Sequence, residues 1–167
     1  MKKKISYPFK FKAAVLFENF KKLQIKQITF NGPLLRGQIL VKILYSGICG
    51  KQIDEIDKVG GKDEYLPHLL GHEGSGIVQD IGPGVKKFKP GDKVVLHWIK
   101  NKGIQSDTPK YHCNNKVINA GWITTFNEYS VVSENRLTKV NIKYPLDKMC
   151  LYGCCILTSF GLIKNVI

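Results

Sequence analysis

Arginine is scarce in this sequence, although the sequence is strongly basic. Arg36 and Arg136 are the two arginines among 26 basic residues, so lysine supplies the other 24 and dominates the net charge of +13. Lysine carries a point charge and lacks the planar fork with which arginine clamps phosphate and reads guanine. The lysines are also scattered among acidic residues along the whole chain. We interpret the charge as a solvated surface and expect no nucleic acid as a partner.

Long apolar runs are absent as well. No stretch approaches the roughly 20 apolar residues that a membrane-spanning helix needs. The basic start at residues 1–4 is not followed by the continuous apolar segment of a secretory signal. We therefore expect a cytoplasmic protein that does not bind membranes. Hydrophobic residues make up 43% of the chain and charged residues 23%, which indicates a folded domain rather than a disordered one.

The cysteines lack the spacing of a disulfide framework or of a closed metal site. There are five, an odd number, and no two of them form a CxxC pair. In a chain without a secretory signal, this pattern favours free thiols.

What the sequence does contain is a series of short strand patterns separated by glycine-rich turns. The polar segment 99–121 predicts a long loop, and apolar positions at helical spacing predict a helix within 146–167. Many short strands with such turns are typical of a small β-barrel, so the expected fold is mainly β with a few helices. The expected strands cover residues 11–17, 38–46, 74–81, 93–98 and 126–133.

Five motifs follow one another in a specific order. GIC ends at Cys49, GHEGSGIV begins at Gly71, GPGV begins at Gly82, KPGDKV begins at Lys89, and a late GC ends at Cys154. This series resembles the zinc-dependent medium-chain alcohol dehydrogenases, and the resemblance runs from about residue 11 to the end of the sequence. It implies a GroES-like β-barrel as the catalytic domain over 11–148. Residues 149–167 would then begin the helix that leads into a Rossmann nucleotide-binding domain.

The resemblance also implies a catalytic zinc site with Cys49, His72 and Cys154 as ligands. Two thiolates and one imidazole suit Zn²⁺, and three protein ligands leave a fourth position for water or substrate. Glu73 is implied as a further residue of the site, which tunes the metal or briefly binds it; the alternative is a carboxylate that never touches zinc. Trp98 stands where the family has a large residue lining the substrate pocket, with ordinary packing as the alternative.

The implied activity is oxidation of an alcohol to an aldehyde or ketone by hydride transfer to NAD or NADP. The zinc would act as a Lewis acid, and the substrate would be a small alcohol or carbonyl compound. The alternative is a non-enzymatic or zinc-free GroES-like barrel that serves as an interaction domain. Such relatives lack the GHE and GC ligands that this sequence carries.

The sequence departs from the family in its cofactor motif. It has no G-x-G-x-x-G turn, which the family uses to bind its dinucleotide. We therefore expect this chain alone to be inactive as a dehydrogenase. An exposed interdomain face would also promote association, with a second copy or the missing nucleotide-binding portion as the partner.

The structural zinc lobe of the family is absent as well. Many members carry four closely spaced cysteines in the region that corresponds to 99–121, and this segment contains only Cys113. One cysteine cannot build a four-cysteine site, so we expect at most one zinc ion per chain.

Two positions beside the expected ligands depart from the family as well. Lys51 stands where the family usually has the Ser or Thr of a proton relay, so it either points away from the metal or has a lowered pKa. Gln52, Asp54 or a chain of waters would then carry the relay, and no relay residue is assigned. Cys155 stands where a glycine is common, and we prefer Cys154 as the ligand because Gly153 precedes it.

Overall fold

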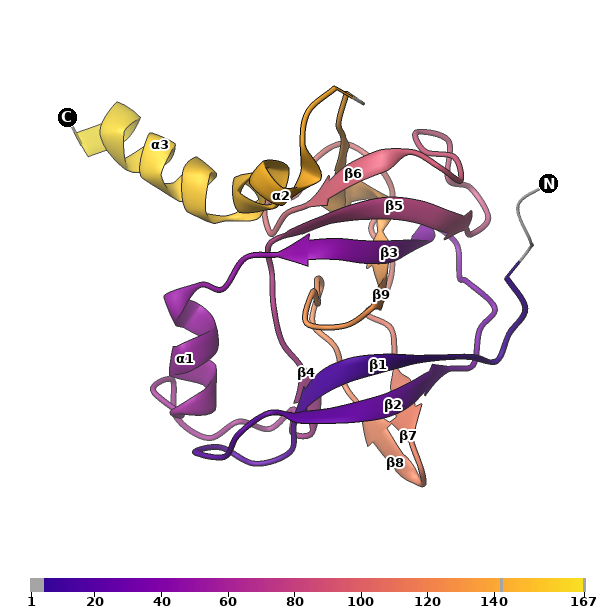
Figure 1. Ribbon diagram of the computed structural model, residues 1–167, viewed down its shortest axis with the longest axis vertical. Helices are drawn as coiled ribbons and strands as arrows, with labels where there is room; N and C mark the ends of the chain where they lie inside the picture. The colour runs from indigo at the N-terminus through magenta and orange to yellow at the C-terminus, as the bar shows by residue number, and fades with distance from the viewer. Residues whose placement is uncertain (1–4, 142, 167) are drawn as a thin grey trace.

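The computed structural model describes residues 5–141 and 143–166, whose strands form two five-stranded sheets lying across from one another (Figure 1). Neighbouring strands are antiparallel in both sheets. Across the first sheet the order is β4 (His68–Leu69), β1 (Phe9–Leu16), β2 (Gln24–Phe30), β7 (Tyr111–Cys113) and β8 (Lys116–Ile118). Across the second it is β10 (Leu137–Lys139), β6 (Lys93–Leu96), β5 (Gly74–Ile81), β3 (Gln38–Ser46) and β9 (Tyr129–Ser133).

An apolar core fills the space between the two sheets. Phe11 of β1 and Ile28 of β2 meet Leu40 of β3 and Val131 of β9 in this core. Tyr111 of β7 is fully buried there, and its hydroxyl accepts a hydrogen bond of 3.0 Å from the backbone N–H of Val131. This bond satisfies two polar groups that would otherwise be buried without partners, and it joins one sheet to the other.

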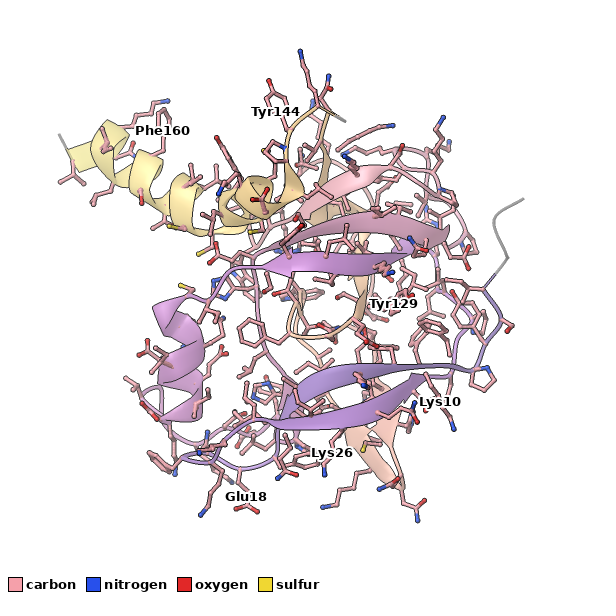
Figure 2. The ribbon with its side chains drawn as sticks, in the orientation of Figure 1. Lys10, Glu18, Lys26, Tyr129, Tyr144 and Phe160 are labelled. Carbon is pink, nitrogen blue, oxygen red and sulfur yellow. The ribbon has the colours of Figure 1, made fainter. Side chains whose placement is uncertain are left out.

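Strand β1 shows how the sequence pattern produces this arrangement. Side chains alternate between the two faces of a strand, so Phe11 and Ala13 are buried while Lys10 and Lys12 are exposed. Figure 2 shows Tyr129 between the sheets, where its ring packs edge-on against Phe9 at a centroid distance of 4.7 Å. In β1 the alternation thus directs the apolar side chains toward the other sheet.

Strand β3 lies between two cores. Leu40 contributes to the core between the sheets, whereas Ile39 and Val41 join a second cluster with Val78 of β5 and Leu96 of β6. Burial on both faces explains why the first half of β3 is almost continuously apolar. The strands predicted over 38–46 and 74–81 coincide with β3 and β5.

The helices lie outside the sheets. Helix α1 (Gly50–Ile56) follows β3, and a 3₁₀ turn, η1 (Glu134–Arg136), follows β9. The last described elements are helix α2 (Leu146–Met149), a second 3₁₀ turn, η2 (Cys150–Gly153), and helix α3 (Cys155–Val166). The buried Ser75 hydroxyl of β5 donates a hydrogen bond of 2.6 Å to the carbonyl of Leu146, which fixes α2 against the second sheet.

Helix α3 projects away from the sheets and has no buried residue (Figure 1). Phe160 stands on the projecting part in Figure 2. No single helix of the described residues is long and apolar enough to cross a membrane, although 146–153 and 155–166 would suffice together by length and composition, with a bend of 54° between them. The large apolar side chains that α3 exposes are Leu157, Phe160, Leu162, Ile163 and Val166.

The prediction of a mainly β fold is confirmed, and several local predictions are wrong. The segment 99–121 is not one long loop, because β7 and β8 form a hairpin within it. Asn114 takes a positive φ of 52° in its turn, which asparagine tolerates well. Strands β2, β4 and β10 and helix α1 were not predicted. The strand predicted over 93–98 ends at Leu96, and the predicted helix within 146–167 is interrupted by η2.

Candidate metal centre

Three side chains from distant parts of the chain converge at one end of the second sheet. Cys49, His72 and Cys154 each offer one ligand atom, and these atoms all lie within 4.8 Å of one another. All three residues are half-buried. In the part of the chain that the structure describes, no other group of three or more His, Cys, Asp or Glu residues meets in this way.

Pairing between β3 and β5 brings the first two residues together. Ser46 at the end of β3 lies opposite Gly74 at the start of β5, so the chain leaves one strand beside the point where it enters the other. The backbone N–H of Gly47 continues this pairing by donating to the carbonyl of Glu73 at 3.1 Å. Cys49 comes two residues after Gly47, and His72 comes directly before Glu73. Both side chains therefore lie at the same end of the sheet.

The third cysteine is brought to the site by close packing of Gly153. A Cβ atom at this position would lie 2.4 Å from the carbonyl oxygen of Leu96 and 2.8 Å from Cα of Glu73. Only glycine therefore lets η2 approach β5 and β6 this closely. Cys154 follows directly, between η2 and α3, and its position depends on this contact.

Substituting Gly153 is expected to destabilise the fold and displace Cys154. For Gly153→Ala we expect the free energy of unfolding to fall by about 2–4 kcal/mol, because the new methyl group meets backbone atoms that cannot rotate away. Gly161→Ala is the matched control: no atom lies within 4 Å of its Cβ, and the change within α3 should stabilise by about 0.5–1 kcal/mol. Chemical denaturation measures both, and equal stabilities for the two variants would contradict the packing.

Glu73 lies beside the three residues, and its carboxylate is enclosed by the chain. The side chain is buried, and its Oε2 accepts a hydrogen bond of 3.0 Å from the backbone N–H of Cys155. A Cβ atom at Gly47 would lie only 2.6 Å from its Cδ, so glycine on the opposite side leaves room for the carboxylate. Glu73 thus connects the segment that carries His72 to the segment that carries Cys154.

The two adjacent cysteines have different surroundings. Cys154 joins the group of three, whereas Cys155 is exposed and uses its backbone N–H to bind Glu73. Burial raises the pKa of the Cys154 thiol; the hydroxyl of Thr158 opposes this, while nearby Cys49 and Glu73 add to the rise. Because a metal binds the thiolate, binding at Cys154 would release a proton. The geometry favours Cys154 as the ligand, as we preferred from the sequence.

Gln52, which the sequence suggested only as one alternative for the proton relay, is a direct neighbour of the site. It is buried on α1, where its side chain contacts both Cys49 and His72. The only signal in the sequence is its position three residues after Cys49, at the third position of a helix, where glutamine reaches back to the cap. Lys51, in contrast, is exposed on the same helix.

Trp98 lies just beyond β6 and is half exposed. Its ring lies 5.7 Å from the guanidinium carbon of Arg136, and its backbone carbonyl accepts a hydrogen bond from the same group. The guanidinium also lies 5.3 Å from the ring of Trp122. Arg136 therefore fixes the backbone at Trp98, whose side chain stays 50% exposed. The role of Trp98 in lining the substrate pocket stays a prediction.

Comparison with known proteins assigns the family. A model of the alcohol dehydrogenase GroES-like domain matches residues 35–142. The chain belongs to this family. The match includes Cys49 and His72 but ends before Cys154, whose place at the site rests on the geometry described above. The GroES-like barrel expected from the motifs is thereby confirmed.

Solved structures extend the comparison over most of the chain. An alcohol dehydrogenase zinc-binding domain protein from Burkholderia ambifaria is 23% identical, with a TM-score of 0.82. The match covers 94% of this chain and 49% of the Burkholderia chain. Benzyl alcohol dehydrogenase from Acinetobacter calcoaceticus is 26% identical, with a TM-score of 0.77, and the match covers 94% of this chain and 48% of that enzyme. CAD from Helicobacter pylori, complexed with NADP(H), is 23% identical, with a TM-score of 0.73, and the match covers 94% of this chain and 49% of that protein. The chain thus spans about half the length of these relatives.

Proposed function

We propose that this chain is the zinc-binding catalytic domain of an alcohol dehydrogenase-type oxidoreductase. Residues 11–148 would form that domain, and 149–167, of which residue 167 lies outside the described residues, would begin the connection to a nucleotide-binding domain. The observation that carries the proposal is the convergence of Cys49, His72 and Cys154 within 4.8 Å. Relatives that share the fold include a benzyl alcohol dehydrogenase, which supports a small alcohol or carbonyl compound as the substrate class.

The donor set fits a catalytic rather than a structural zinc ion. Two thiolates and one imidazole are the ligands of the catalytic zinc in alcohol dehydrogenase, and three protein ligands leave a fourth position open. A Zn²⁺ ion bound there would supply a Lewis acid, which polarises the oxygen of an alcohol or a carbonyl compound. Cys49, His72 and Cys154 would hold the ion, while Glu73 keeps Cys154 in place through the N–H of Cys155.

The hydride acceptor would be NAD or NADP. The relative from Helicobacter pylori is complexed with NADP(H), which supports a nicotinamide cofactor but does not choose between the two for this chain. Since these 167 residues have no G-x-G-x-x-G turn, the cofactor would bind mainly to a nucleotide-binding portion outside them. We therefore expect no alcohol turnover from these 167 residues alone. Trp98 is proposed to line the substrate side of the site.

Cobalt substitution tests for an open thiolate-rich site. The metal-free protein loaded with Co²⁺ should show sulfur-to-cobalt charge-transfer absorption and the d–d bands of a tetrahedral ion. Adding imidazole should shift the d–d bands, because a fourth position is free to accept it. A closed site with four protein ligands would give bands that imidazole leaves unchanged.

Two cysteine variants make this test specific. Cys49→Ser should lose the charge-transfer band, whereas Cys113→Ser should retain it, because Cys113 is buried in the core between the sheets. Retention of the band in Cys49→Ser, or no cobalt binding by the folded wild type, would contradict the proposed function and favour a non-enzymatic barrel.

A further inference from the structure

The Gln52 side chain bridges two of the three proposed ligands. It is 2% exposed, and its amide is held at both ends. Its Oε1 accepts a hydrogen bond of 3.0 Å from the backbone N–H of Cys49, at the start of α1. Its Nε2 lies 2.5 Å from Nδ1 of His72. A single buried amide therefore contacts both the segment of Cys49 and the ring of His72.

The orientation of this amide follows from the donor at its other end. A backbone N–H can only donate, so the atom of Gln52 that faces Cys49 has to be the oxygen. The NH₂ group then faces His72, and a hydrogen bond forms only if Nδ1 of His72 accepts. A neutral imidazole carries one proton, so the proton of His72 lies on Nε2 in this arrangement.

A bound metal needs the opposite arrangement. Nδ1 is occupied by Gln52, so Nε2 is the nitrogen of His72 that is left to bind a metal. A neutral imidazole that binds metal through Nε2 carries its proton on Nδ1 and normally donates it to an acceptor. In that state the NH₂ group of Gln52 faces the Nδ1–H of His72, so two hydrogen-bond donors meet without an acceptor. If the amide turns over, its oxygen serves His72 but its NH₂ faces the N–H of Cys49.

We propose that Gln52 is a positioning residue that sets the proton of His72 and couples metal binding to the first turn of α1. The amide has one oxygen, which can accept from the backbone N–H of Cys49 or from the Nδ1–H of His72 but not from both. When metal is bound, one of these two N–H groups is therefore left without an acceptor. This inference rests on the proposed metal centre and adds to it that the glutamine holds zinc affinity below what the same ligands would otherwise give. A carboxylate at position 52 would accept from both groups.

The first test compares zinc affinities by competition with a chelator. Gln52→Glu supplies two acceptor oxygens and should bind zinc about 10-fold more tightly than the wild type, the scale on which such neighbours of metal ligands act. Ile53→Glu is the control for charge: it places the same charge on α1, at a side chain that is 56% exposed, and should change the affinity less than about threefold. No gain in Gln52→Glu, or an equal gain in Ile53→Glu, would overturn the proposal.

The second test needs no metal and begins with the wild type. Nitrogen-15 NMR of the metal-free protein at about pH 8, where imidazole is neutral, should show the proton of His72 on Nε2. Gln52→Glu should move it to Nδ1. A proton on Nδ1 in the wild type would overturn the inference about Gln52, whereas a wild type that binds no zinc would overturn the proposed function. The two failures are therefore distinguished.

Discussion

Cys154→Ser is expected to lower zinc affinity by about 10³-fold, while Cys155→Ser should change it less than about threefold. The first substitution removes one of three ligands from the group in which the ligand atoms lie within 4.8 Å. The second changes an exposed side chain and leaves intact the backbone N–H that binds Glu73. Competition with a chelator measures both affinities under the same conditions.

This pair of variants separates ligand loss from local misfolding. Both substitutions lie at the junction of η2 and α3, so a general disturbance of that junction would weaken zinc binding in both. Retention of zinc by Cys154→Ser together with its loss from Cys155→Ser would make Cys155 the ligand. The assignment of Cys154 would then be wrong, although a zinc site would remain.

Glu134→Gln is expected to lower the free energy of unfolding by about 2–4 kcal/mol at neutral pH. Glu134 is 3% exposed, and its carboxylate accepts three backbone N–H groups: Lys86 at 2.9 Å and Lys87 at 3.0 Å on Oε1, and Ile104 at 2.9 Å on Oε2. A glutamine of the same shape keeps one acceptor oxygen and places an NH₂ group against donors. The loops around 86 and 104 would then lose a shared partner.

The effect of Glu134→Gln should depend on pH. Burial raises the pKa of Glu134, but the backbone hydrogen bonds from Lys87, Ile104 and Lys86 and the nearby Lys87 charge outweigh it, so the pKa is lowered. A carboxyl group with a lowered folded pKa stabilises the protein above its unfolded pKa of about 4.3 and loses this contribution as the pH falls through the folded value. The stability difference between wild type and variant should therefore shrink in acid.

Glu128→Gln is the matched control for this prediction. Its carboxylate is exposed and accepts one backbone N–H, from Lys12 at 2.8 Å. We expect a loss below about 1 kcal/mol. Denaturant titrations at neutral and acid pH measure all three proteins. A Glu134→Gln effect no larger than that of Glu128→Gln, or one that is unchanged in acid, would show that the ionised carboxylate does not hold the two loops.

The sequence predicted most of the strands that are long enough to have a distinctive pattern, although the seven-residue β2 was missed. Strands β3 and β5 were located to the residue because each has eight or nine residues with a clear apolar pattern and flanking glycines. Strands β7, β8 and β10 have three residues each, too few to show an alternation. Helix α1 has seven residues and is stabilised by Gln52 at its start, so its existence depends on a side-chain contact that no periodicity reveals.

The candidate site was predictable as a set of residues rather than as an arrangement. The motif order named Cys49, His72 and Cys154, and the structure brings these three together. The role of Glu73 was left open, and its bond to Cys155 depends on the close approach of η2 to β5, which the sequence does not show. The same applies to Gln52 and His72, which lie 20 residues apart and meet only in the folded chain.

Elemental analysis of the purified wild-type chain, beside Cys49→Ser, tests the central claim most directly. We expect about one zinc ion per wild-type chain and close to none in the variant, because the described residues contain one three-ligand group and Cys49 belongs to it. A folded wild type without zinc would contradict the proposed catalytic metal centre. A content near two ions would contradict the expectation of a single site.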